Sequence, residues 1–398
     1  MLLSAAPAFA QEAARSADLF EGPALESRGG DVRVQLGLLV QGDFKFTVND
    51  GEDQDVDPFV LRRVRPFVRG QLGHHFEFFL NPDFSTTSTV VVQDLYVDTV
   101  LAPAFRLRVG KEKTPFGLER LQSALNLLFL ERAMPTAIAP NRDIGIEALG
   151  DIHGGVISYL AAVMNGVEDG GSFDRHSADG KDVSGRFVVR PFTTRTTHPL
   201  RGLALAIAGS AGDHARTPLR SFRTQTSLQR YFSYASGVVN DGTRIRYSPQ
   251  VSYYHGRFGG FGEYVHSEAP LRRAEVRQEI AHQAWQLAGS WVLSGEAATD
   301  ATAGVQPRVN FDPRARHWGA LQVAARYHTL NVAEEAVTLG LVAAGASRRA
   351  AAWTLGMNWY LSGNVRCTAN FERTVFDGGS PQARPAENLI AFRTQLAF

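Results

Sequence analysis

The amino-acid sequence predicts an all-β fold, a sixteen-stranded antiparallel transmembrane β-barrel. Three observations lead to this prediction. Apolar and polar side chains alternate at every second position in many segments, as in strands with one apolar and one polar face. These segments are about ten residues long, the length that a tilted membrane-spanning strand needs. Short and long connections alternate along the chain, as in barrels with turns on one side of a membrane and loops on the other.

The first ten residues, MLLSAAPAFA, read as the remnant of a signal peptide. They contain a short apolar run and an A-x-A site at residues 8–10, so cleavage is expected before Gln11. Residues 11–30 are expected to form a flexible leader. The barrel is therefore expected over residues 31–398 of an exported protein.

The segment 351–361, AAWTLGMNWYL, illustrates the alternation. Trp353 and Leu355 fall on an apolar face, and Thr354 and Asn358 fall on a polar one. A soluble β-sandwich also alternates, but its strands are usually about five to six residues long. The expected strands, an even number, are 32–42, 59–72, 74–84, 90–100, 104–112, 143–150, 153–165, 183–192, 202–211, 242–254, 258–268, 280–294, 315–329, 350–361, 364–376 and 387–398.

The connections are very short after the second, fourth, sixth, tenth and fourteenth strands. They are long after the first, fifth, seventh, ninth and thirteenth, and the longest are 113–142 and 212–241. The link at about 295–314 is too long for a tight turn, so it is either a large turn on the short side or a sign of a miscount. The last strand ends on Phe398, a terminal aromatic residue that resembles the assembly signal of outer-membrane barrels.

Composition excludes several other classes of protein. The net charge of +1 over 398 residues gives no electrostatic case for binding nucleic acid. The single cysteine, Cys367, rules out a disulfide framework, and His74 and His75 have no partner at metal-ligand spacing. No hydrolase, metalloprotease or phosphate-loop motif is present. We therefore expect no catalytic residues, no cofactor and no metal; an outer-membrane lipase or protease barrel is the rival interpretation.

Several stretches together resemble successive motifs of the phosphate- and polyphosphate-selective porins, the porin O/P family. They are VLRRVRPFVRGQL, RLRVGKEKTPFGLERL, LFLERAM, NRDIGIEALG, VMNGVEDG, GRFVVRPF, DGTRIRYSPQVSYYHG, WVLSGE, AARYHTL, TLGMNWYLSGNVR and AFRTQLAF. The resemblance covers about residues 31–398. It implies a trimeric, anion-preferring porin of the bacterial outer membrane, whose third external loop folds into the pore. That loop corresponds to the long connection at about 113–142.

The stretch VLRRVRPFVRGQL carries four arginines on one expected strand. Arg63, Arg65 and Arg69 share one parity, and Val60, Val64, Pro66, Val68 and Leu72 share the other. An arginine on the lipid face costs about 2–4 kcal/mol at the bilayer midplane, so the arginine face is assigned to the lumen. Arg62 has the wrong parity and either reaches the membrane interface or is turned inward by a bulge.

Two further groups of basic residues are candidates for the lining of the pore. Arg244 and Arg246 lie opposite an apolar face, and their R-x-R motif matches a family position in an arginine ladder, as the resemblance implies. Arg106 and Arg108 have inward parity on another strand.

The pattern of strand 104–112 is expected to break at Gly110. Beyond this glycine, Lys111 or Lys113 is expected to point into the lumen. On the neighbouring strand, Asp94 and Tyr96 share a face, and the aspartate is expected either to moderate anion binding or to balance charge across the wall.

The function expected from these residues is passive diffusion of small anions (phosphate, polyphosphate and chloride) along an arginine-lined pore. Guanidinium groups match oxyanions in bidentate geometry, which favours this interpretation. A general-diffusion porin with little anion selectivity is the alternative. Of the 41 basic residues only four are lysines, whereas phosphate-selective family members carry many. The expected partners are these anions, membrane lipid and two further copies of the chain.

Overall fold

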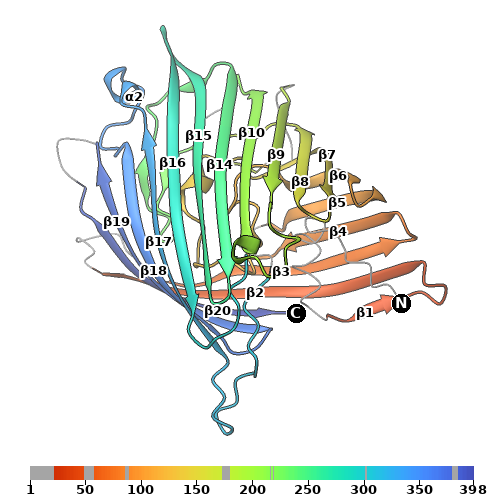
Figure 1. Cartoon of the computed structure of the whole chain (residues 1–398). Coiled ribbons are helices and arrows are strands. Elements are labelled where there is room, and N and C mark those ends of the chain that lie inside the picture. Colours follow the sequence, from red (N-terminus) through yellow and green to blue (C-terminus); the bar gives the residue numbers. More distant parts are fainter. Residues whose placement is uncertain are drawn as a thin grey trace.

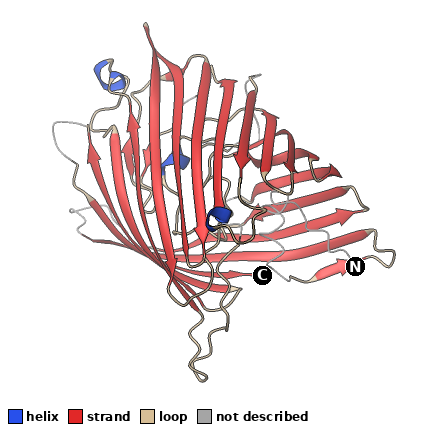
Figure 2. Cartoon of the chain, in the orientation of Figure 1, coloured by secondary structure: helices blue, strands red, loops and turns tan. Residues whose placement is uncertain are grey.

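The computed structural model describes residues 22–48, 58–85, 89–172, 180–215, 217, 219–300, 303–378 and 384–398. The expected signal-peptide remnant, residues 1–10, and residues 11–21 of the expected leader lie outside this part of the chain. Figure 1 shows the described chain curving into a closed barrel, with the C-terminus at one rim. Figure 2 shows that strands make up almost all of it. Within the described residues, no helix is long and apolar enough to cross a bilayer.

Sixteen strands form the barrel wall, which confirms the expected fold class. They are β2 (Val32–Val48), β3 (Phe59–Leu72), β4 (Phe76–Asp83), β5 (Val91–Ala102), β6 (Phe105–Lys113), β7 (Arg142–Ile152), β8 (Ile157–Met164), β9 (Asp182–Val189), β10 (Leu203–Asp213), β14 (Thr243–His255), β15 (Phe258–Arg273), β16 (Val276–Val292), β17 (Ala320–Val332), β18 (Arg349–Tyr360), β19 (Val365–Asp377) and β20 (Glu387–Ala397).

Each wall strand pairs in antiparallel register with its neighbours in the chain. The first wall strand also pairs with the last, from Leu39 opposite Ala397 to Val48 opposite Asn388, and this pairing closes the barrel. Closure leaves no free sheet edge in the membrane, where unpaired backbone groups are costly. The minor elements are β1 (Ala24–Glu26), β11 (Phe222–Arg223), β12 (Arg230–Phe232), β13 (Val239–Asn240), η1 (Met134–Ala137), η2 (Pro199–Gly202) and α2 (Glu335–Thr338).

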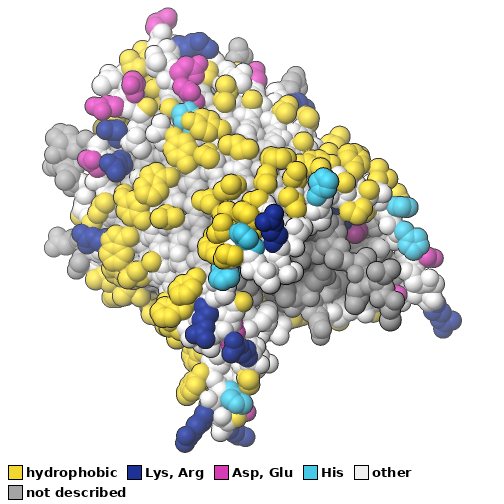
Figure 3. Space-filling view, in the orientation of Figure 1, with side chains coloured by type: hydrophobic (Ala, Val, Ile, Leu, Met, Phe, Trp, Pro, Cys, Tyr) yellow, Lys and Arg dark blue, Asp and Glu magenta, His cyan; other side chains and the backbone are white. Residues whose placement is uncertain are grey.

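Alternation explains why the strands adopt this arrangement. In β16, Trp285 and Leu287 are exposed on the outer surface, whereas Ala284 and Gln286 are buried on the inner one. An apolar outer face gains from contact with lipid, and polar groups on the inner face keep their hydrogen bonds. Figure 3 shows hydrophobic side chains across the face formed by β10 and β14–β16, with charged side chains gathered toward its two ends.

The two ends of the barrel differ in their connections. At the end where the C-terminus lies, here the turn end, the connections are 73–75, 103–104, 153–156, 190–202, 256–257, 293–319 and 361–364. At the opposite end, here the loop end, they are 49–58, 84–90, 114–141, 165–181, 214–242, 274–275, 333–348 and 378–386.

Two of these connections differ in length from what the sequence pattern indicated or left undecided. Connection 293–319 is a large turn on the short side, so the strand count does not slip there. In contrast, the expected gap at 269–279 is almost entirely strand, and only Ala274 and Glu275 form the turn. Residues 272–279 are all exposed. Strand ends that project beyond the bilayer can be polar on both faces, so their alternation disappears from the sequence.

The third loop-end connection, residues 114–141, is named loop L3. Its residues are mostly buried inside the barrel, and Phe116, Met134 and Ile138 pack in an apolar cluster with inward-facing residues of β15–β17. Polar side chains of the wall bind the backbone of loop L3. Asn358 donates to Leu128 O at 2.9 Å and Gln41 donates to Ala124 O at 3.1 Å.

Candidate functional site: basic and aromatic cavities along the lumen

A cavity of about 500 Å³ lies between loop L3 and the wall, toward the loop end. Eight basic residues and one acidic residue, Glu131, are among the described residues that line it. We name it the basic cavity. Its basic residues are Arg62, Arg63, Arg65, Lys111, Arg120, Arg132, Arg142 and Arg220.

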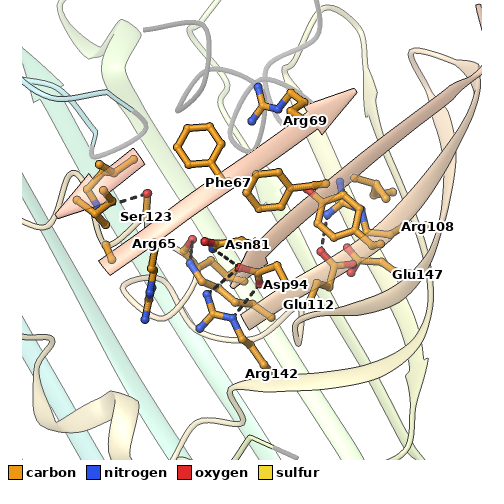
Figure 4. Close-up of a pocket in the computed structure, with 18 of the residues that line it drawn as sticks. Arg65, Phe67, Arg69, Asn81, Asp94, Arg108, Glu112, Ser123, Arg142 and Glu147 are labelled. Atoms are coloured by element: carbon orange, nitrogen blue, oxygen red, sulfur yellow. Dashed lines mark hydrogen bonds and ion pairs between the residues drawn. The ribbon is translucent and has the colours of Figure 1, made fainter. Parts of the chain in front are cut away.

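A second cavity, of about 190 Å³, adjoins the first because Arg65 and Arg142 line both. We name it the aromatic cavity, after the rings of Phe67, Phe79 and Tyr96 in its wall. Figure 4 shows Arg65, Phe67 and Arg69 extending from one strand beside this space.

A β-bulge in β3 decides the orientation of Arg62. Gln41 of β2 pairs with Arg63, but the next residue of β2, Gly42, pairs with Leu61, so Arg62 is the extra residue. Its guanidinium reaches loop L3, where Nε donates to Glu131 Oε1 at 2.7 Å. Of the two alternatives drawn from parity, the structure contains the bulge that turns this arginine inward.

The bulge also reverses the faces of β3 on its loop-end side. Phe59 and Leu61 are 85% and 63% exposed, whereas Val60 pairs with the inward-facing Asp43. The expectation that Val60 shares the lipid face with Val64 is therefore wrong. A single inserted residue shifts the two-residue period by one, so the inward and outward faces exchange beyond it. The sequence pattern of this strand does not reveal the position of the inserted residue.

Glu131 is held by three guanidinium groups at the wall of the basic cavity. Arg63 Nη2 lies 3.3 Å from one carboxylate oxygen and Arg393 Nη2 lies 2.9 Å from the other, in addition to the contact with Arg62. Although burial opposes it, the charges of Arg63 and Arg62 hold the pKa of Glu131 well below its usual range. This carboxylate, which the described residues of the lining contribute, is thus ionised and neutralised by its neighbours.

Arg65 and Arg142 stand where the two cavities meet. Arg65 Nε donates to Asp83 Oδ2 at 2.7 Å. Arg142 binds Asp94 in bidentate geometry, at 2.8 and 3.1 Å, and Asn81 donates to the same aspartate at 2.8 Å. Asp94 therefore balances charge on the wall, one of the two roles considered for it.

Two arginines of loop L3 differ from those on the strands in what they contact. Arg132 donates to the backbone oxygens of Glu119 and Gln122, at 2.9 and 2.5 Å, and Arg120 donates to Thr136 O. Neither has an ion pair with a carboxylate among the contacts of the described residues. Burial, with Arg132 and Arg142 nearby, lowers the pKa of Arg120. An anion between these guanidiniums would relieve their repulsion.

Sequence parity could not identify Arg120, Arg132, Arg142 or Arg220 as lining residues. The first two lie in loop L3, where no strand period exists, and Arg220 lies in another loop-end connection and donates to Gly170 O at 3.0 Å. The available signal was the arginine content of the motifs PFGLERL and LFLERAM within the third long connection.

Arg69 and Arg108 lie at the aromatic cavity. The guanidinium carbon of Arg69 is 5.7 Å from the ring centre of Phe79, and that of Arg108 is 3.8 Å from the ring centre of Tyr96. Arg108 also binds Asp98 through two hydrogen bonds, of 2.6 and 2.8 Å, and pairs with Glu112.

Arg106 and the two lysines near Gly110 have different surroundings. Arg106 lies nearer the turn end, where it pairs with Glu77 at 2.6 Å and with Asp98 at 3.1 Å. Lys111 lines the basic cavity and Lys113 the aromatic one. Their Nζ atoms donate to the backbone oxygens of Val92 and Leu121, at 2.6 and 2.8 Å.

Arg244 and Arg246 lie apart from both cavities, which differs from the expectation that they line the path. Each is 1% exposed. Arg244 pairs with Asp169 at 3.1 Å, and Arg246 pairs with Asp169 at 2.8 Å and with Asp182 at 3.3 Å. Asp169 belongs to connection 165–181, which folds over them. Inward parity is correct for both residues, but a loop closes their access to the lumen.

The described residues contain no cluster of three or more histidine, cysteine or carboxylate groups that could hold a metal ion. What the arrangement offers instead is a row of positive groups along the two adjoining cavities. Such a row stabilises anions without any chemical step.

Comparison with known proteins agrees with this arrangement. A family model described as phosphate-selective porin O and P matches residues 34–398. No match was found among curated proteins. Similar solved structures include the outer membrane channel DcaP of Acinetobacter baumannii, with a TM-score of 0.61 and 10% identity over 95% of this chain and 100% of that one.

Two further solved structures share the fold. OmpF of Salmonella typhi, in complex with daunomycin, has a TM-score of 0.57 and 10% identity over 94% of this chain and 100% of that one. OmpT of Vibrio cholerae, in its trimer form, has a TM-score of 0.55 and 13% identity over 92% of this chain and 99% of that one.

Proposed function

The chain belongs to the phosphate-selective porin O and P family and is a porin of the bacterial outer membrane; from this premise we propose that it conducts small anions passively through the basic cavity. The observation that carries the proposal is the composition of that cavity, whose described lining has eight basic residues and one carboxylate. Charged rings and rows of this kind are a usual route to anion selectivity.

The proposed path runs from the loop end to the turn end. An anion enters beside Arg220, passes Arg120 and Arg132 in the basic cavity, and crosses between Arg65 and Arg142. Each guanidinium offers several N–H donors in a plane, so an oxyanion can exchange one set of donors for the next. Conduction needs each stop to be weak enough for the anion to leave. The backbone contacts of Arg120 and Arg132 hold them in place without neutralising them.

Phosphate and polyphosphate are the proposed natural solutes. Three observations support this part: the family, the bidentate match between guanidinium and phosphate, and the two loop arginines that have no carboxylate partner among the described contacts. Lysine contributes only Lys111 and Lys113 to the two cavities. The donors in the proposed path are therefore mainly guanidiniums.

A general-diffusion porin with little anion selectivity is the second candidate. The observation that favours it is that all four strand arginines in the described lining of the basic cavity have a carboxylate partner. Arg62 and Arg63 share Glu131, Arg65 pairs with Asp83, and Arg142 pairs with Asp94. Paired charges have weak fields at a distance. The anion-selective and the general-diffusion functions differ in whether the charges of Arg120 and Arg132 dominate the electrostatic field in the basic cavity.

The test is the reversal potential of purified protein in a planar bilayer under a potassium chloride gradient. We expect anion preference for the wild type. The double substitution Arg120→Gln/Arg132→Gln should move the reversal potential toward zero, because it removes both arginines of loop L3, neither of which has a carboxylate partner among the described contacts. Arg314→Gln/Arg316→Gln, in exposed positions of turn 293–319, is the matched control and should leave it unchanged.

Cation preference of the wild type would overturn the proposal. A wild-type potential near zero would instead support general diffusion. Phosphate specificity is tested separately, by adding phosphate to channels that carry chloride current. Inhibition at low phosphate concentration supports it, and an unchanged current in millimolar phosphate contradicts it.

A trimer is the proposed assembly, supported by the family and by the OmpT relative that was solved in a trimer form. Electrophoresis of detergent-extracted protein without heating should give a band of about three times the mass of the boiled chain. Cross-linking in native membranes that stops at the monomer would contradict the proposal.

A further inference from the structure

Three aromatic side chains form a continuous strip on the lumen wall of the aromatic cavity. The ring centres of Phe67 and Phe79 lie 6.0 Å apart, and those of Phe79 and Tyr96 lie 5.6 Å apart. The three residues come from β3, β4 and β5, which are neighbours in the sheet. Aromatic pairs with these separations stabilise one another, so the strip has a defined geometry.

A glycine on the adjoining strand makes room for the first ring. Gly37 of β2 pairs with Phe67, and a Cβ atom at position 37 would lie only 2.0 Å from the ring of Phe67. The ring therefore lies over the backbone of β2, where any other residue at position 37 would displace it.

The opposite side of the aromatic cavity is also apolar. Loop L3 contributes Leu121, Ala124 and Leu125, and Leu39 of β2 lies beside them. Gln395 and Gln41 bind the backbone oxygens of Leu125 and Ala124, each at 3.1 Å, and so hold this part of the loop at a fixed distance from the wall. The space between the rings and the loop is about 190 Å³.

Positive groups surround this apolar space. Arg65 and Arg142 stand where it meets the basic cavity, while Arg69 and Arg108 lie against the ring faces of Phe79 and Tyr96. With Lys113 the described lining contains five basic residues against three carboxylates, Asp94, Glu112 and Glu147. Arg142 and Arg108 neutralise the first two of these carboxylates.

An inorganic anion gains little from such walls, because apolar side chains offer no donors to replace its water. A flat apolar ring gains from both sides of the space. We propose that the aromatic cavity binds organic anions whose carboxylate is attached to an aromatic ring, with the ring between the strip and loop L3 and the carboxylate at Arg65 and Arg142. The inference rests on the proposed conduction of anions and adds a class of solute to it.

The first experiment needs no variant. Benzoate, acetate and cyclohexanecarboxylate are added in turn to single wild-type channels that carry chloride current, and the concentration that halves the current is measured. Benzoate should act at about one tenth of the acetate concentration, because it alone buries a planar ring. Cyclohexanecarboxylate should fall between the two, since its ring is apolar but not flat.

A variant then locates the effect. Phe79→Leu removes the central ring of the strip. The ratio of the half-blocking concentration of acetate to that of benzoate, about ten in the wild type, should fall to about two or three, because the stacking contribution is lost. This ratio is taken within one channel, so a change in total conductance does not disturb it. Phe187→Leu, an exposed position on the outer face of β9, is the matched control and should keep the wild-type ratio.

The outcomes separate this inference from the proposed function. Anion preference with equal half-blocking concentrations of benzoate and acetate overturns the inference alone. Cation preference overturns the proposed function, whatever benzoate does. Benzylammonium that blocks at lower concentration than benzoate would assign the cavity to cations, through Glu112 and Glu147, and would also overturn the inference.

Discussion

Arginine side chains inside this barrel differ in what opposes their charge. Arg120 and Arg132 contact only backbone oxygens among the described contacts, whereas Arg62 and Arg63 share a carboxylate at the edge of the basic cavity. Arg246 is enclosed with two aspartates. The same residue type with the same inward direction therefore has different effects on a passing ion, because a guanidinium without a carboxylate partner projects a stronger field into the lumen than a paired one.

Replacing Glu131 by glutamine should change the electrostatic field in the basic cavity strongly, because it removes a charge and leaves the shape of the side chain almost unchanged. We predict that Glu131→Gln increases anion preference, because Arg62, Arg63 and Arg393 lose their common counter-charge. Loss of one member of a buried ion-pair network should also lower the free energy of unfolding by about 3 kcal/mol. Reversal potential and denaturant unfolding measure the two effects. Glu275→Gln, in the exposed turn between β15 and β16, is the control; an unchanged reversal potential in Glu131→Gln would contradict the prediction.

The lowered pKa of Glu131 leads to a prediction about acid. A carboxylate whose pKa is depressed in the folded state stabilises that state at neutral pH, and this contribution is lost only as the pH falls through the depressed value. Arg62, Arg63, Arg393 and Lys45 surround this carboxylate. We therefore expect the attachment of loop L3 through Glu131, and the part of the conductance that depends on this attachment, to stay constant between about pH 8 and pH 5. Conductance recorded in steps over this range checks this, and a transition near pH 5 would contradict it.

Loop L3 is the element that divides the lumen, and the far wall holds it in place. Arg393 donates to Leu130 O at 2.5 Å, Arg366 donates to Leu127 O at 3.2 Å, and Arg326 donates to Glu131 O at 2.9 Å. These three arginines come from β20, β19 and β17. They position the loop so that its own arginines face the opposite wall, formed by β3–β7.

Removing one of these anchors should release part of the loop. Arg393→Gln loses the contact with Leu130 and leaves Asp43, which is 3% exposed, without its bidentate partner. We predict that the free energy of unfolding falls by about 3–5 kcal/mol, and that single-channel current becomes noisier. Arg373→Gln, an exposed neighbour on β19, is the control. Currents as quiet as those of the wild type would show that the remaining anchors suffice.

Across the whole barrel, the two adjoining cavities differ in chemistry. The basic cavity faces the loop end, where residues of connections 165–181 and 214–242 line it, and the aromatic cavity lies nearer the turn end. A path with its positive charge near one mouth is electrostatically asymmetric.

We predict that this asymmetry is measurable. Phosphate added on the loop-end side should inhibit chloride current at lower concentration than phosphate added on the turn-end side, because it meets the basic cavity first. Protein inserted in one orientation, with each chamber perfused separately, provides the measurement. Equal inhibition from both sides would place the dominant site near the middle of the path.

Some features of the barrel could be predicted from the sequence, and others could not. Period-two alternation was sufficient to place sixteen strands, because lipid and water on opposite faces impose it on each strand separately. It also assigned Arg63 and Arg65 to the lumen side, where both line the basic cavity. It failed at the ends of β15 and β16, where both faces are exposed beyond the bilayer. It could not orient Arg62 or Val60, because a bulge interrupts the period without a sequence signature.

Local periodicity in the sequence was enough to predict the barrel, its strand number and the side of the wall to which most arginines belong. Which arginines border an open cavity could be seen only in the folded chain. That depends on where loop L3 and connection 165–181 fold, through contacts between residues far apart in the chain: Glu131 with Arg393 in one case and Asp169 with Arg246 in the other. The position of a residue in the two-residue period predicts whether its side chain points inward. Its access to the lumen depends on whether a loop folds over it.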